Sequence, residues 1–143
     1  YRDIIYTRPD SDWRFYAQYR LAMSIVASLR GPDYDLNRME LAVGHLREFL
    51  NSKPEGPQMV EAATKALLMI KQWQVKRHLD IADFYQTLKN TEGQRYHLQL
   101  ATRPAFDQVP GYEQAMERRQ KFESANPAAA TTTSPPMPTG GHP

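Results

Sequence analysis

The chain of 143 residues contains no cysteine. This absence excludes disulfide bonds, thiolate metal sites and cysteine nucleophiles, but it assigns no compartment. Long hydrophobic runs are also missing: a membrane-spanning helix needs ~20 apolar residues, and the best candidate is only the stretch from Leu21 to Leu29. The first residue is Tyr1 and not methionine. We therefore expect a processed chain or a fragment, in which any upstream signal sequence or lipidated cysteine would be missing.

The chain also lacks a clear excess of positive or negative charge. The formal net charge is +2, and the lysines and arginines are scattered along the chain. Nucleic-acid-binding proteins concentrate basic residues in a patch or stripe, and membrane-surface segments carry a polybasic cluster. Only the short runs KRH at 76–78 and RR at 118–119 favour a nucleic-acid partner. The composition therefore predicts neither nucleic-acid binding nor direct membrane binding.

Motifs for phosphate binding, nucleophilic catalysis and calcium binding are absent or incomplete. No glycine-rich phosphate loop and no serine elbow occurs. Asp33, Asp35 and Asn37 form a D-x-D-x-N pattern that resembles the start of a calcium loop. However, Arg38 stands where that loop needs glycine, and Gly44 stands where it needs glutamate. We interpret this stretch as a polar loop followed by a helix cap.

The histidines offer the remaining metal chemistry. His45 and Glu48 lie three residues apart, and His78 is close in sequence to Asp80 and Asp83. Di-iron bundles use a Glu-x-x-His pattern twice with two further glutamates, whereas the order here is reversed and unrepeated. We interpret the first pair as a solvated helix face and the second group as a surface patch. We predict no catalytic residue, no metal and no cofactor; a helical-bundle enzyme or metal-binding protein remains the alternative from another functional class.

Amphipathic helices are what the sequence does contain. Apolar residues recur at helical spacing in five segments, which glycine and proline separate. These segments begin near residues 11, 37, 57, 96 and 111. We expect Asp10 or Ser11 to cap the first segment, and Asn37 with Glu40 to form a capping box for the second. No strand pattern of useful length occurs, so we predict an all-α fold.

The third segment is the longest, because neither glycine nor proline occurs between Gln58 and Asn90. Its apolar stripe meets two polar residues and then returns in phase. The stripe comprises Val60, Ala63, Leu67, Ile70, Gln74, Arg77, Ile81, Phe84 and Leu88. This pattern predicts either one long helix with a polar gap or two helices joined by a turn between Gln74 and His78, and the preserved phase favours the long helix. A turn is expected over 90–93.

Composition changes near the end of the chain. Residues 124–143 are small, proline-rich and uncharged apart from one histidine. Such a segment buries too little apolar surface to offset its ordering entropy. We predict a helical repeat domain over 1–123 and a disordered tail over 124–143.

The second helical segment has the spacing of a tetratricopeptide repeat. Ala42, Leu46, Phe49 and Pro54 provide the small residue, the two bulky packing residues and the helix-ending proline. In the first segment, the run YRLA at 19–22 resembles the matching start of a repeat. We therefore predict a tetratricopeptide-like helix-pair solenoid with one long helix. A generic helical bundle would bury the same stripes and is the alternative.

The lengthened loop RGPDYDLN makes this resemblance more specific. The runs YRLAMS, DYDLNRMELAVGHLREFLNSKP and VEAATKALLMIKQWQVKRHLDIADFY resemble the BamD-type outer-membrane assembly lipoproteins, over roughly residues 16–85. The run IADFY at 81–85 is the closest single piece. The resemblance implies the C-terminal half of a non-catalytic scaffold, anchored by a lipid absent from this chain, at the periplasmic face of the outer membrane.

The same resemblance implies a partner and a site. In the family, the region after the FY motif helps to dock the lipoprotein to the periplasmic domains of a β-barrel insertase. Here Gly93 takes the small position, and the family's arginine falls near His97, with Arg95 close by. Arg95 and His97 are therefore the predicted partner-binding residues. A tetratricopeptide adaptor in another cell-envelope or secretion complex is the alternative function.

Overall fold

The computed structural model describes residue 2 and residues 13–127, and its regular elements are all helical. The elements are α2 (Arg14–Ser28), α3 (Leu36–Asn51), α4 (Pro57–Thr87), α5 (Thr91–Ala101), the 3-10 helix η1 (Pro104–Phe106) and α6 (Tyr112–Ala125). The predicted all-α class is confirmed for this part of the chain. Most of the predicted tail, 128–143, lies outside the described residues, while its first residues, Ser124 and Ala125, belong to α6.

The helix starts differ from those predicted. Asp10 and Ser11 lie outside the described residues, and α2 begins after Trp13 without a side-chain cap. The predicted capping box at Asn37 is wrong, because the Asp35 carboxylate accepts the Asn37 backbone N–H at 2.8 Å and caps α3. The start of α3 is therefore set by an earlier aspartate, whose short side chain satisfies a backbone donor at the helix end.

The turn expected over 90–93 is also wrong. The Asn90 side chain accepts the Gly93 N–H at 2.9 Å and so caps α5, which already begins at Thr91. The connection between α4 and α5 is correspondingly short, and it includes Lys89 with a positive φ of 56°. A short connection of this kind makes α4 and α5 an antiparallel hairpin.

Helix α4 is continuous for 31 residues, which confirms the long helix. Such a helix is about 46 Å long. Gln74 at its middle is only 2% exposed. Its Nε2 atom donates a hydrogen bond of 2.8 Å to Oε2 of Glu40 on α3. The polar gap in the apolar stripe is therefore satisfied by a neighbouring helix, and no turn is needed there.

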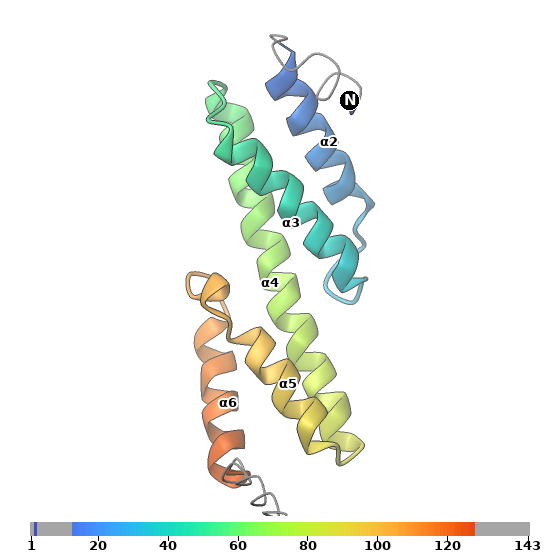
Figure 1. Ribbon diagram of the computed structural model, residues 1–143, viewed down its shortest axis with the longest axis vertical. Coiled ribbons are helices and arrows are strands. Elements are labelled where there is room, and N and C mark those ends of the chain that lie inside the picture. The colour runs from blue at the N-terminus through green and yellow to red at the C-terminus, as the bar shows by residue number, and fades with distance from the viewer. Residues whose placement is uncertain (1, 3–12, 128–143) are drawn as a thin grey trace, which may run out of the picture.

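The two halves of α4 have different neighbours (Figure 1). Helices α2 and α3 pack on the first half, where Ala63 and Ile70 are buried. Helices α5 and α6 pack on the second half, where Val75 and Ala82 are buried. The core-facing side of α4 therefore changes along its length, because each half meets helices that approach from a different direction.

This change of side corrects the predicted stripe of α4. Its first half is as expected, but Phe84 and Leu88 in the second half are 59% and 57% exposed. His78 and Ala82 take the buried positions instead. The prediction assumed that the same side of α4 is buried along its whole length. This assumption fails because the second half packs against other helices on another side.

The first core lies among α2, α3 and the first half of α4. Phe49, Leu46 and Met39 of α3 are fully buried there, together with Ala42. Fully burying one large apolar side chain contributes about 1.5–3 kcal/mol. Three of the positions that the repeat pattern requires, Ala42, Leu46 and Phe49, are thus core residues. Two smaller apolar clusters lie along the second half of α4. One contains Phe106 and Ala115, and the other contains Leu98 and Phe122.

Candidate protein-interaction site

The α4–α5 hairpin brings the predicted site residues next to the end of the long helix. Gly93 makes this close packing possible, because a Cβ atom at this position would lie 2.7 Å from Cδ1 of Tyr85. The Tyr85 ring of α4 stacks on the His97 ring of α5, with centroids 5.6 Å apart and planes 21° apart. The small residue therefore fixes the distance between the two helices and positions His97 against α4.

His97 also meets His78 of α4. Their Nδ1 atoms are 3.1 Å apart, so the N–H of one ring donates a hydrogen bond to the ring nitrogen of the other. Burial lowers the pKa of His78 to about 4, with further contributions from the charge that His97 carries once it is protonated and from the positive charge of Arg103. Burial also lowers the pKa of His97. Both rings are consequently neutral near pH 7, which suits a hydrogen bond between two imidazoles.

The interpretation of His78 as part of a surface patch is wrong. Its side chain is only 6% exposed, because it occupies the side of α4 that faces α5. The two aspartates grouped with it in the sequence lie elsewhere on the helix. Asp80 accepts a hydrogen bond of 2.8 Å from Lys76, and Asp83 pairs with Arg118 of α6.

Arg95 points away from His97 and toward α6. One guanidinium nitrogen lies 2.7 Å from Oε1 of Glu92, and another donates to the Asn126 carbonyl oxygen at 3.0 Å. The Nε atom lies 3.7 Å from Oε1 of Glu123. The guanidinium carbon sits 5.3 Å from the centroid of the Phe122 ring. With its side chain 16% exposed, Arg95 ties α5 to the end of α6.

Between the two predicted residues lies Tyr96, which the sequence analysis did not single out. Its side chain is 58% exposed, close to the values for Phe84 and Leu88. The Tyr96 ring makes an edge contact with the His97 ring, with centroids 5.2 Å apart, and the centroids of the Phe84 and Tyr85 rings are 5.9 Å apart. We call Phe84, Leu88 and Tyr96 the hairpin face. The available signal was the spacing of Phe84 and Leu88, which places both on one side of a helix.

Helix α6 covers a different flank of the hairpin. Ala82 of α4 and Leu98 of α5 pack together with Phe122 of α6 in one apolar cluster. The hairpin face takes no part in that cluster. The hairpin thus has one flank closed by α6, while Phe84, Leu88 and Tyr96 are exposed to solvent.

Over residues 13–127, no group of three or more histidine, aspartate or glutamate side chains is arranged to hold a metal ion. The Nδ1 atom of His45 lies 3.9 Å from Oε2 of Glu48 as a lone pair on α3. None of the described helices is both long and apolar enough to cross a bilayer.

Comparisons with known proteins add no family to this description. No protein-family model, no curated protein and no solved structure matches the chain.

Proposed function

We propose that this chain is a non-catalytic helical scaffold that binds a protein partner through the hairpin face. The proposal rests on one observation: three large apolar side chains of the α4–α5 hairpin, Phe84, Leu88 and Tyr96, are each more than half exposed. Aromatic residues on a rigid element lose little conformational freedom on binding and are frequent anchors of protein interfaces. The stacked Tyr85 and His97 rings link two of these side chains, because Phe84 contacts Tyr85 and Tyr96 contacts His97.

The more specific proposal is a BamD-like component of the outer-membrane β-barrel assembly machinery, at the periplasmic face of that membrane. The resemblance over residues 16–85 supports it. The partner is then the periplasmic part of a β-barrel insertase. A tetratricopeptide-like adaptor in another envelope or secretion complex would use the same fold and face with a different partner.

The two residues first predicted to bind the partner have distinct proposed roles. His97 holds the rings of Tyr85 and Tyr96 in place and is itself partly exposed. Arg95 is engaged with α6, so its substitution would displace that helix as well as remove a charge. Direct contact of either residue with a partner stays a prediction, and the hairpin face is the better place to test binding.

The test is an affinity pull-down of the tagged full-length protein from detergent-solubilised envelopes, with mass spectrometry of the bound proteins. We expect the wild type to retain an insertase with periplasmic domains. The double variant Phe84→Ser with Tyr96→Ser should lose it, since both anchors are removed.

The matched control is Glu117→Ser on α6, an exposed position outside the hairpin face. It should bind like the wild type. Retention of the insertase by the double variant would refute the role of the hairpin face. Recovery of other envelope proteins in its place would refute the BamD-like assignment and leave the scaffold function standing.

A further inference from the structure

The contact between α4 and α5 has a titratable pair near its centre. On the buried side of α4, His78 lies between Val75, which belongs to one apolar cluster, and Ala82, which belongs to another. Its partner on α5 is His97, which the close approach at Gly93 brings within reach. A hydrogen bond between two imidazole rings therefore stands where a continuous core would have apolar side chains.

This hydrogen bond depends on the protonation of both rings. One added proton preserves the bond but places a positive charge at His78, which is only 6% exposed. A second proton makes both Nδ1 atoms donors, 3.1 Å apart with no acceptor between them. Each added proton therefore favours separation of the two rings.

The surrounding charges do not compensate for a proton on His78. Besides burial, the groups that lower its pKa are His97 and Arg103, and both are cationic when charged. The carboxylates on the packed helices have other partners: Asp80 pairs with Lys76, Asp83 with Arg118, Glu92 and Glu123 with Arg95, and Glu40 accepts from Gln74. On α6, Arg119 donates to the Thr102 hydroxyl oxygen. No carboxylate of the described residues is thus placed to stabilise a charged His78.

We propose that the His78–His97 pair is a pH-sensitive switch, whose protonation separates α5 from the second half of α4 while the α2–α3 half stays packed. Because Tyr96 contacts the His97 ring, the hairpin face is rearranged when the switch opens. Release of a partner under acidic conditions follows from this rearrangement and rests on the proposed function. The opening itself does not depend on that function.

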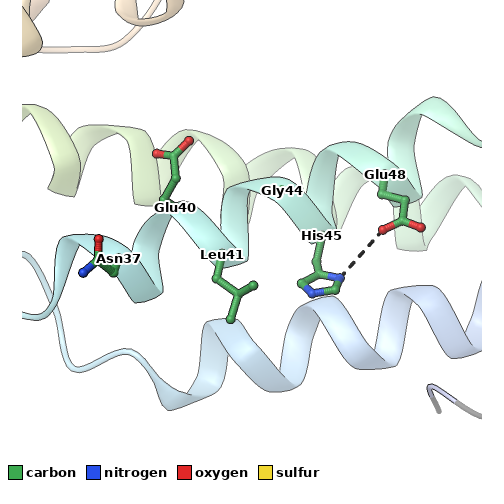
Figure 2. Close-up of a pocket in the computed structure, with 6 residues that line it drawn as sticks. All are labelled: Asn37, Glu40, Leu41, Gly44, His45 and Glu48. Atoms are coloured by element: carbon green, nitrogen blue, oxygen red, sulfur yellow. Dashed lines mark ion pairs between the residues drawn. The ribbon is translucent and has the colours of Figure 1, made fainter.

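The α2–α3 half provides an internal reference, because its polar groups respond differently to acid. The buried polar side chains there are Gln18 and Gln74, which do not titrate. The histidine of α3, His45, has its Nδ1 atom 3.9 Å from Oε2 of Glu48 (Figure 2). A proton on His45 therefore gains a carboxylate partner and meets no second imidazole. Mild acid should leave this half of the molecule closed.

The test is native-state hydrogen exchange of the full chain at pH 7 and pH 5, corrected for intrinsic exchange rates. Histidines are the side chains that titrate in this interval, which lies above the ordinary pKa values of carboxyl groups. The pKa of His78 is about 4 in the packed chain and 6.5 in an exposed imidazole, so the ratio of open to closed molecules should rise about twentyfold. We expect the protection of α5 amides to fall by about that factor, and that of α3 amides by less than about threefold.

Two different substitutions remove the titrating group. His78→Gln keeps an amide that can hydrogen-bond to His97, whereas His78→Leu replaces the ring with an apolar side chain. Both variants should lose most of the pH-dependent fall in α5 protection, so that a packing defect specific to one of them cannot account for the result. His45→Gln on α3 is the matched control and should respond to pH like the wild type.

Three results would overturn the proposal. An equal fall in α3 and α5 would indicate global unfolding in place of local opening. No fall in α5 would show that the pair does not separate the helices. An undiminished fall in both His78 variants would assign the response to other groups. The measurement needs no partner, so failure of the hairpin variants in the pull-down would leave it unaffected.

Discussion

The two halves of α4 show two ways of holding neighbours against the same helix. Around the first half, large apolar side chains such as Phe49, Leu46 and Ile70 are fully buried. Around the second half the buried core residues are fewer, and polar contacts also join the helices: His78 to His97, and Arg95 to Asn126. The first half therefore depends mainly on apolar burial, and the second depends also on groups whose protonation and geometry must be correct.

The largest expected effect is in the apolar half. Phe49→Ala should lower the free energy of unfolding by about 3–5 kcal/mol, because it removes a fully buried ring and leaves a cavity. Urea unfolding followed by circular dichroism measures this change. The matched control is Phe84→Ala at a 59% exposed position, which should change stability by no more than about 0.5 kcal/mol. A similar loss for both variants would contradict the placement of these two rings.

The second effect concerns pH and belongs to the polar half. The pKa of His78 is lowered from 6.5 to about 4 in the folded chain, so the unfolded chain binds a proton first as the pH falls. The contribution of neutral His78 to the free energy of unfolding is therefore fully present above the unfolded pKa. It is lost between about pH 6.5 and 4, by a total of about 3 kcal/mol. Protonation of both rings also replaces their hydrogen bond with repulsion.

The measurement is chemical denaturation at several pH values between 7 and 4. His78→Leu keeps an apolar side chain of similar bulk at the buried position and removes the titrating group. The variant should lose most of the pH dependence in that window. An unchanged pH dependence in His78→Leu would show that other groups, and not this histidine pair, account for it.

The third effect tests the contact between α5 and α6. Arg95→Ala should lower the free energy of unfolding by about 2 kcal/mol, because hydrogen bonds from a charged donor are lost. Hydrogen exchange should increase in α6 more than in α3. Arg118→Ala is a useful comparison, since Arg118 pairs with an Asp83 side chain that is 54% exposed. This variant should lower the free energy of unfolding by less than Arg95→Ala does. Equal exchange in α3 and α6 of the Arg95 variant would contradict the assigned role.

The smallest effects distinguish the two helical glycines. Gly44→Ala should raise the free energy of unfolding by about 1 kcal/mol, because alanine has the higher helix propensity and the space is open. Gly93→Ala gains the same propensity but forces a methyl group into the Tyr85 ring, so we expect a net loss of about 1 kcal/mol. Thermal melts of the two variants should therefore shift in opposite directions. Shifts of the same sign would contradict the packing described at one of these positions.

The same contrast explains what could be predicted from the sequence. The continuity of α4 and the burial of Ala42, Leu46 and Phe49 follow from local composition and helical spacing, and both are confirmed. The buried side of the second half of α4 was mispredicted at Phe84. That side depends on where α5 and α6 pack, and helical periodicity within α4 contains no information about their direction.

The site was harder to predict for a related reason. The sequence does not indicate that the rings of His78 and His97 meet. Their contact depends on how closely Gly93 lets α5 approach α4. The chain position of Arg95 likewise does not indicate that α6 engages its guanidinium. Tyr96 was overlooked because exposure is a property of the packed helices. The cap of α3 was predicted more closely: it was expected at Asn37 and is Asp35, two residues earlier in the polar loop that the sequence had indicated.

The central claim, that the hairpin face binds a protein partner, is tested most directly by site-specific photo-crosslinking. A photoreactive phenylalanine analogue is placed at position 96 of the full-length protein in intact envelopes, and, as control, at position 117 on α6. Our account expects a crosslink from position 96 to a periplasmic domain of a β-barrel insertase and none from position 117. No protein crosslink at position 96, or the same products from both positions, would contradict it.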